Sequence, residues 1–376
     1  MPLLNETSDG GTHRRRVLTY WILAASLPVF YLWIRGAPWL SSETFHTVLE
    51  VSATLIAFFV GVLALIRFYS KKNNTVLFLG AGFLGTGLLD GYHAAVTSAY
   101  FKVLMPSDLP SLIPWSWIAS RQFLALMLLL SWLGWRREQR AGASGRIPER
   151  WVYVIAAVLT GVSFLFFAFV PLPPAYYTDL FFHRPGEFIS AVILGVTLWG
   201  YLNKGTWAHD GLEHWLVLSL IAGLMAQAVY MPFSAELYDL EFDAAHLLKI
   251  VSYVFVLIGL AGSMYQVFRA AEEGHMRTRA LVDHAVDGII TIDDKGIVES
   301  LNPAGEKIFQ VSAEDVIGSN VRVLMPDPYR AQHDRFVTGS LSTPDAKILG
   351  VGQMVRGRRP DGAFFPLDLA MSELSL

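Results

Sequence analysis

Seven ionisable side chains lie within apolar stretches of this sequence, where a charge is costly and usually marks a functional site. They come from four segments that are far apart along the chain, and in order they are His46, Glu50, Asp90, His93, Arg121, His246 and Lys249. Three imidazoles plus one carboxylate are an ordinary ligand set for zinc, copper or iron. The residue types that would supply this set are His46, His93, His246 and Glu50.

Three kinds of chemistry fit these residue types. The first is a buried salt-bridge network in which Glu50 and Asp90 neutralise Arg121 and Lys249 and hold four helices together, because charges must cancel at low dielectric. The second is a metal or haem site, in which Arg121 and Lys249 orient the carboxylates behind the ligands. The third is a pocket for a small molecule that enters from outside or from the lipid, with the histidines as pH-sensitive contacts.

The elements that must position these residues are membrane-spanning helices. Of the 376 residues, 53% are hydrophobic and only 16% are charged, which excludes an ordinary soluble domain. Apolar runs close to the ~20 residues needed to cross a bilayer predict about eight transmembrane helices. These runs are 17–34, 45–66, 76–97, 113–135, 151–171, 186–202, 214–231 and 245–266.

The charges of the connecting segments predict the orientation of these helices. Lys and Arg gather before the first run, after the second, between the fourth and fifth, after the sixth and after the eighth. The other connections have few, and the stretch 234–243 is acidic. By the positive-inside rule both termini are cytoplasmic, which requires an even number of crossings.

This orientation brings the seven side chains to one level, near the outer face of the membrane. Residues three or four apart share a helix face, as His46 and Glu50 do. At 1.5 Å per residue, all seven lie within roughly 12 Å of the outer boundary. Glu187, at the start of the sixth run, is placed to join them.

Other sequence features exclude several classes of site. The chain has no cysteine, which rules out disulfides and thiolate ligands. Its net charge is −3 and it has no basic patch with interleaved aromatic residues, so we expect no nucleic-acid partner. The third run carries a small-residue face that predicts close helix packing, formed by Gly80, Gly82, Gly85, Gly87 and Gly91.

Four short motifs, taken in order, resemble a known sensor family. They are Phe45-His46-Thr47-Val48-Leu49-Glu50, Leu89-Asp90-Gly91-Tyr92-His93, Trp117-Ile118-Ala119-Ser120-Arg121 and His246-Leu247-Leu248-Lys249. Together they resemble a membrane-associated sensor domain of the MASE type. Such domains precede PAS, histidine-kinase or diguanylate-cyclase modules in bacterial signalling proteins. The resemblance covers about residues 15–268 and implies ligand or environmental sensing in the bacterial inner membrane, without identifying the ligand.

The C-terminal part has a different character. Residues 269–284 are polar and predict a helical continuation of the last span. Strands are predicted over 288–293 and 297–301, followed by a short helix that Asn302 caps and that ends near Phe309. Two further strands, over 348–358 and 363–374, are joined by a Pro-Asp-Gly turn and predict a hairpin.

This order of elements, with Ala285-Val286-Asp287-Gly288, Asn302-Pro303-Ala304 and Arg359-Pro360-Asp361-Gly362, resembles a PAS domain over about residues 275–376. The stretch 324–330 with His333 and Asp334 is similar to the haem PAS domain of FixL-like oxygen sensors. By that resemblance His333 would be the iron ligand. Gln353 stands where those sensors carry a ligand-responsive arginine, and the alternative role for His333 is a helix residue that relays signal or dimerises.

We therefore expect an α-helical membrane bundle plus a C-terminal α+β PAS domain with an antiparallel sheet. The expected divisions are a cytoplasmic tail (1–16), the membrane sensor domain (17–268), a signalling helix (269–284) and a PAS domain lacking its last strand (285–376). The sensed cue is a ligand, a metal ion or a redox change at the outer site.

The sequence carries no kinase or cyclase motif. We therefore expect no catalysis by this chain, which would be a fragment of a longer receptor or an input module with a kinase or cyclase as its output. An unpaired sheet edge is a liability, which favours a fragment or a homodimer. The alternative function is that of a metal- or haem-binding membrane oxidoreductase or a transporter.

Overall fold

The computed structural model describes residues 5–98, 100–177, 179–327, 330 and 353–372. The chain divides into two compact units, Met1–Val267 and Phe268–Leu376.

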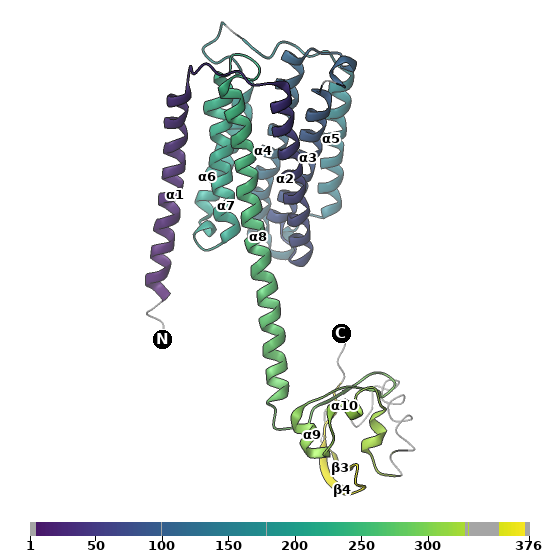
Figure 1. The fold of residues 1–376 in the computed structure, drawn as a ribbon. Coiled ribbons are helices and arrows are strands. Elements are labelled where there is room, and N and C mark those ends of the chain that lie inside the picture. Colours follow the sequence, from purple (N-terminus) through teal and green to yellow (C-terminus); the bar gives the residue numbers. More distant parts are fainter. Residues whose placement is uncertain (1–4, 99, 178, 328–329, 331–352, 373–376) are drawn as a thin grey trace. The chain divides into compact units, whose positions relative to one another are not determined.

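The N-terminal unit is a bundle of long helices that run side by side (Figure 1). They are α1 (Asn5–Ile34), α2 (Glu43–Ser70), α3 (Asn74–Val96), α4 (Leu109–Ala141), α5 (Glu149–Phe169), α6 (Glu187–Lys204), α7 (Gly211–Met225) and α8 (Leu240–Asp283). Within the described residues, all but α6 are long and apolar enough to cross a membrane, α7 together with the turns that extend it. The short α6 begins with Glu187 and ends with Lys204. The mostly helical membrane bundle agrees with the sequence prediction. The predicted run 186–202 corresponds to α6, so seven of the eight predicted spans have a counterpart among the described helices that can cross a membrane.

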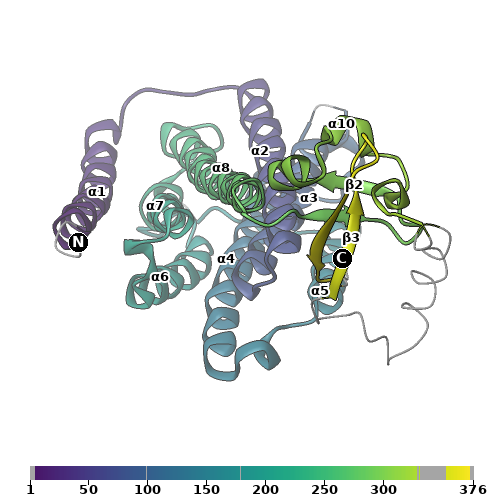
Figure 2. The same cartoon turned by 90° about the horizontal axis from the view of Figure 1, so that it is seen from below.

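Helix α3 packs against α2, α4 and α5, and its glycines make these contacts close. A Cβ atom added to Gly82 would lie 2.7 Å from Cβ of Met127 on α4, and one added to Gly91 would lie 3.2 Å from Thr54 on α2. The helix is accordingly buried over most of its length. Helix α1 lies at the edge of the bundle beside α7 (Figure 2).

Helix α7 does not end as a regular α-helix. It continues into a π-helical turn, η4 (Ala226–Tyr230), and then into a 3₁₀ turn, η5 (Met231–Phe233). Such π turns are rare and often occur at functional sites. The hydrophobic run 214–231 predicted a membrane span here but did not distinguish a π turn from an α-helix.

Helix α8 is the longest element and passes from the first unit into the second. Inside the bundle it contacts α3, where the rings of Tyr253 and Phe83 are 5.2 Å apart. Further along, Gly259 lies against Trp215 of α7, and Ser263 accepts a hydrogen bond of 3.1 Å from Nε of Arg67 on α2. These contacts show that α8 runs along the bundle. Its sequence contains no proline.

The C-terminal unit contains two antiparallel strand pairs and short helices. Strand β1 (Ile290–Ile292) pairs with β2 (Val298–Leu301), and β3 (Gln353–Arg358) pairs with β4 (Phe364–Leu369). Between the pairs lie α9 (Pro303–Phe309) and α10 (Ala313–Val316). The predicted 360–362 hairpin and the helix ending at Phe309 are confirmed. His333 lies outside the described residues.

Asn302 ties the end of α8 to the first strand pair. Its side-chain oxygen accepts hydrogen bonds from the backbone N–H groups of Gly305 and Ile289, which caps α9 as predicted. Its amide nitrogen donates to the carbonyl oxygens of Val282 and Asp287 at 2.9 and 3.0 Å. One buried side chain thus joins the last turn of α8 to strands β1 and β2.

The close contact between α3 and α4 gives a first test. Replacing Gly82 by Ala should lower the free energy of unfolding by about 1–3 kcal/mol, because the added methyl group overlaps the stem of Met127. The matched control is Gly195→Ala on α6, where an added Cβ meets no atom within 4 Å. Thermal unfolding of the two variants in detergent measures the difference. Equal melting temperatures for the two variants would contradict this packing.

Candidate functional site

Four buried side chains from three helices direct their donor atoms to one point. His46 and Glu50 come from α2, His93 from α3 and His246 from α8. One ligand atom of each lies within 4.8 Å of the ligand atoms of all the others. The four residues are between 0 and 1% exposed. This is the set that the sequence named as metal ligands.

The shortest separations in this group join potential ligands. Nε2 of His46 lies 3.2 Å from Nε2 of His93, and Nε2 of His246 lies 3.1 Å from Oε1 of Glu50. The same carboxylate oxygen is 3.9 and 4.0 Å from the Nε2 atoms of His46 and His93. We call His46, Glu50, His93 and His246 the histidine–glutamate cluster.

Hydrogen bonds behind the cluster assign the tautomers of two histidines. Nδ1 of His246 lies 2.7 Å from the carbonyl oxygen of Phe242, which can only accept, so Nδ1 carries the proton. Nδ1 of His93 lies 2.6 Å from the hydroxyl of Ser116, which itself donates to the carbonyl oxygen of Leu112. Both histidines therefore present an unprotonated Nε2 to the centre, as metal-ligating histidines do.

This arrangement leaves electron pairs facing one another in a buried place. Nε2 of His246 and Oε1 of Glu50 are both acceptors, and among the residues described here Nε2 of His246 and Oε2 of Glu50 have no hydrogen-bond partner. Two buried acceptors at 3.1 Å repel each other unless a proton or a metal ion neutralises them. The geometry therefore calls for either a proton or a cation between these two atoms.

Lys249 already supplies one positive charge to this group. Its Nζ atom lies 2.5 Å from Oε1 of Glu50 and 3.9 Å from Oδ2 of Asp90. It also lies 4.8 Å from the ring centroid of Trp117, a cation–π contact. The ammonium group thus connects the histidine–glutamate cluster to a second group of polar residues.

That second group is centred on Asp90 and Arg121. Nη2 of Arg121 donates to both carboxylate oxygens of Asp90, at 2.8 and 3.0 Å. Tyr253 and Ser120 donate their hydroxyl protons to the same carboxylate. Asp90 therefore accepts four hydrogen bonds, and its charge is compensated by one guanidinium group.

Trp117 links the cluster to a third buried pair. Its ring centroid is 4.2 Å from that of His246, and its Nε1 atom donates to Oε2 of Glu187 at 3.1 Å. Oε1 of Glu187 accepts from Nη2 of Arg184 at 2.5 Å. Glu187 thus lies behind Trp117 rather than in contact with the ligands.

Two residues close the cluster on the side where α8 begins. Asp243 is buried, accepts a hydrogen bond of 2.8 Å from Trp39, and forms no ion pair with a Lys or Arg in the described part of the chain. The ring of Tyr238 lies 5.8 Å from that of His46, and burial raises the pKa of its hydroxyl to about 12, so it stays neutral. Asp243 is therefore a buried carboxyl group held by a hydrogen bond and not by an ion pair within the described residues.

The structure brings together all seven residues singled out in the sequence. They form one continuous group in which Glu50 pairs with Lys249 and Asp90 pairs with Arg121. Sequence reasoning missed Ser116, Asp243 and Tyr253. Asp243 and Tyr253 were detectable, because they lie three and four residues from His246 and Lys249 on the same face of α8. Arg184 belongs to a connection between helices, and no periodicity marks it.

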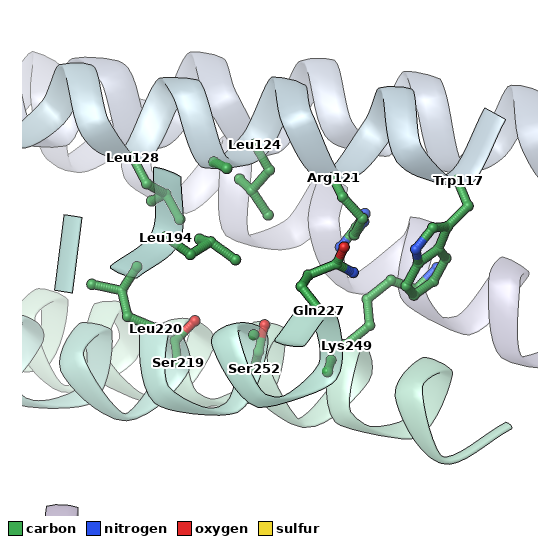
Figure 3. Close-up of a pocket in the computed structure, with 13 residues that line it drawn as sticks. Trp117, Arg121, Leu124, Leu128, Leu194, Ser219, Leu220, Gln227, Lys249 and Ser252 are labelled. Atoms are coloured by element: carbon green, nitrogen blue, oxygen red, sulfur yellow. The ribbon is translucent and has the colours of Figure 1, made fainter. Parts of the chain in front are cut away.

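A small cavity adjoins the group between α4, α6, α7 and α8. Its volume is about 30 Å³, enough for one or two water molecules. Figure 3 shows polar side chains at one end of it and leucines at the other. The polar end is formed by Trp117, Arg121, Gln227 and Lys249, and the apolar end by Leu124, Leu128, Leu194 and Leu220.

Comparison with known proteins identifies this bundle. Residues 40–264, more than half of the chain, match the family model of the MASE3 membrane-associated sensor domain. The chain belongs to the MASE3 family. Residues 277–375, after the MASE3 domain, match the model of the PAS fold. A MASE3 domain followed by a PAS domain is what the sequence motifs predicted.

Two curated relatives are themselves sensors. The sensor protein FixL of Bradyrhizobium diazoefficiens is 37% identical over 107 residues, which cover 27% of this chain and 21% of FixL. The oxygen sensor protein DosP of Escherichia coli is 27% identical over 88 residues, which cover 23% of this chain and 11% of DosP. The chain thus spans about a fifth or less of these relatives. Together with the MASE3 domain, they support a membrane-located sensory module of signal transduction with a FixL-like PAS domain.

The Asp90–Arg121 pair of the MASE3 domain can be tested against an exposed pair. Asp90→Asn should lower the free energy of unfolding by about 3–5 kcal/mol, because it leaves the guanidinium group buried without a counter-charge. The control is Glu43→Gln, which breaks the 2.7 Å pair between Glu43 and Lys102, whose side chains are about one-third exposed. That change should cost about 1 kcal/mol or less. Chemical unfolding in detergent compares them, and a similar loss in both variants would count against a structural role for the buried pair.

Proposed function

We propose that the MASE3 domain binds one divalent first-row transition-metal ion through His46, Glu50, His93 and His246, and that occupancy of this site is the cue that the protein senses. The observation that carries the proposal is the convergence of four buried donors from α2, α3 and α8. Nδ1 of His93 and of His246 is held by a hydrogen-bond acceptor behind it. A group that served only as a salt bridge would not need three imidazoles, two of them held with an unprotonated Nε2 facing inwards.

The donor spacing favours a small tetrahedral ion. Bonds of about 2.0–2.1 Å from zinc to nitrogen place neighbouring ligands of a tetrahedron roughly 3.3–3.4 Å apart. The distances of 3.1 and 3.2 Å are close to this spacing, while the longer separations, which stay within 4.8 Å, require the donors to move closer together. A porphyrin has no room between donors that lie within 4.8 Å of one another, which argues against haem at this position.

The charges near the cluster support a cation of this kind. Glu50 and Asp90 are paired with Lys249 and Arg121, and Asp243 is a further buried carboxyl group, without an ion-pair partner within the described ranges, that can ionise beside a cation. An added divalent ion is therefore partly neutralised by groups already present. This matters because isolated charges are costly at low dielectric.

The signal would pass along α8. This helix carries His246 and Lys249 and continues without a break to Asp283, next to the carbonyl of Val282 that Asn302 holds. A metal ion would connect α8 to α2 and α3, and a small shift of a packed helix is a known way to transmit a signal. With the orientation from the positive-inside rule, the ion would come from the periplasmic side and both termini would be cytoplasmic. The PAS domain would then act within a homodimer on a kinase or cyclase.

Sensing is favoured over the alternative functions by the domains that accompany the site. A buried metal centre also suits an oxidoreductase, but the chain belongs to a sensor family and carries a PAS domain. Haem in the PAS domain stays a prediction that rests on the resemblance to FixL-like sensors. Its expected ligand, His333, lies outside the residues that the structure describes.

Metal binding is tested on the purified full chain. We expect about one equivalent of zinc after dialysis, and a tetrahedral absorption spectrum when cobalt replaces zinc. His46→Ala, His93→Ala and His246→Ala should each weaken zinc binding by at least roughly 100-fold, and Ser116→Ala by roughly 10–100-fold. His214→Ala is the control, because this histidine hydrogen-bonds Tyr20, away from the cluster. Protein that takes up no zinc would refute the proposed function.

Relay along α8 is tested by hydrogen exchange. Saturating zinc should change the exchange rates of backbone amides in residues 269–283, because the ion alters how α8 is held in the bundle. The same zinc concentration should leave these rates unchanged in His93→Ala. Wild-type protein that binds zinc without any change in this segment would rule out transmission through the helix.

A further inference from the structure

The carboxylate of Glu50 has two competing partners. The ammonium group of Lys249 lies 2.5 Å from Oε1, the same oxygen that is 3.1 Å from Nε2 of His246. A metal ion bound to Glu50 and His246 would therefore lie within a few ångströms of the ammonium charge. Two like charges at such a distance repel strongly in a site that excludes water.

The structure provides another place for this ammonium group. Lys249 lines the polar end of the cavity between α4, α6, α7 and α8 (Figure 3). Oδ2 of Asp90 is already 3.9 Å from Nζ of Lys249. The ammonium group of Lys249 thus has a second carboxylate nearby and a cavity beside it that its side chain can enter.

Gln227 is the second acceptor at this end of the cavity. It is only 1% exposed, and neither its amide oxygen nor its amide nitrogen has a hydrogen-bond partner among the residues that are described. A buried amide without partners is costly and calls for an explanation. Gln227 belongs to the π turn η4, which places it on the cavity wall.

We infer that Lys249 is an exchangeable internal cation, which neutralises Glu50 until a metal ion binds and then moves to Asp90 and the amide oxygen of Gln227. The inference rests on the proposed metal site. No covalent bond changes, and the lysine keeps its proton and its charge in both positions. The divalent ion takes over the negative charge of Glu50, and the cavity accepts the displaced ammonium group.

The exchange changes the partners of α8. With Lys249 on Glu50, this side chain connects α8 to α2. With Lys249 at the cavity, the same residue would be held by α3 through Asp90 and by the end of α7 through Gln227. The metal affinity then depends on two things, how tightly Glu50 holds the lysine and how well the cavity receives it.

Zinc titrations of the full-length protein test this, with a competing chelator to set the free zinc concentration. Gln227→Leu, which removes the acceptor, should weaken zinc binding about tenfold. Gln227→Glu, which strengthens it, should tighten binding about tenfold. Ser219→Ala is the control, because Ser219 lines the same cavity on α7 and has no role in the exchange.

A double-mutant cycle with Lys249→Met isolates the effect. This substitution removes the competitor and should tighten zinc binding at least tenfold, and in its background the two Gln227 substitutions should have no effect. Equal effects of the Gln227 substitutions with and without Lys249 would overturn the exchange. If Lys249→Met does not fold, the test is the direction in which the two Gln227 substitutions change the zinc affinity of the otherwise wild-type protein. Opposite directions support the exchange, and the same direction overturns it. Absence of zinc binding by wild-type protein is a separate result, which refutes the metal site itself.

Discussion

The arrangement depends on one buried carboxylate. Glu50 is fully enclosed on α2, and a bare carboxylate in such surroundings would be driven to take up a proton or to lose its burial. Three imidazoles and an ammonium group from α2, α3 and α8 surround it instead. The side chains in this part of the bundle are placed so that they compensate the single negative charge of Glu50. These partners come from α2 itself, from α3 and from α8.

Close approach of the helices is what makes this compensation geometrically feasible. Gly91 lies between Asp90 and His93 in sequence and faces Thr54, which is one turn beyond Glu50 on α2. A larger side chain at that position would push α2 and α3 apart at the level of the cluster. The glycine-rich face of α3 therefore serves the site as well as the packing. Behind it, Trp117 lies between His246 and the Glu187–Arg184 pair and contacts both.

Much of the site was predictable because two independent rules apply to membrane helices. Helical periodicity put His246 and Lys249 on one face, and the distribution of loop charge put all seven residues at one level. Neither rule tells which helices are neighbours around the bundle, so the division into a Glu50–Lys249 pair and an Asp90–Arg121 pair needed coordinates.

Other features lie beyond such rules altogether. Arg184 sits in an irregular connection, and the position of Gln227 depends on a π turn that has the same hydrophobic pattern as an α-helix. In the C-terminal unit, by contrast, local signals were sufficient. The cap at Asn302 and the Pro-Asp-Gly hairpin involve residues close together in sequence, so their geometry is set by short-range sterics and hydrogen bonds.

The unbroken length of α8 has a consequence for how such a receptor can be altered. A helix without proline acts as a rigid rod over a few turns, and each added residue rotates the downstream part of the chain by about 100°. The number of residues between Lys249 and Asp283 therefore fixes how far the helix turns about its axis between these two positions. A seven-residue insertion in the polar part of the helix would nearly restore that rotational position. A two-residue insertion would instead turn the downstream residues to the opposite side of the helix. Engineered fusions to this module must therefore respect the helical repeat.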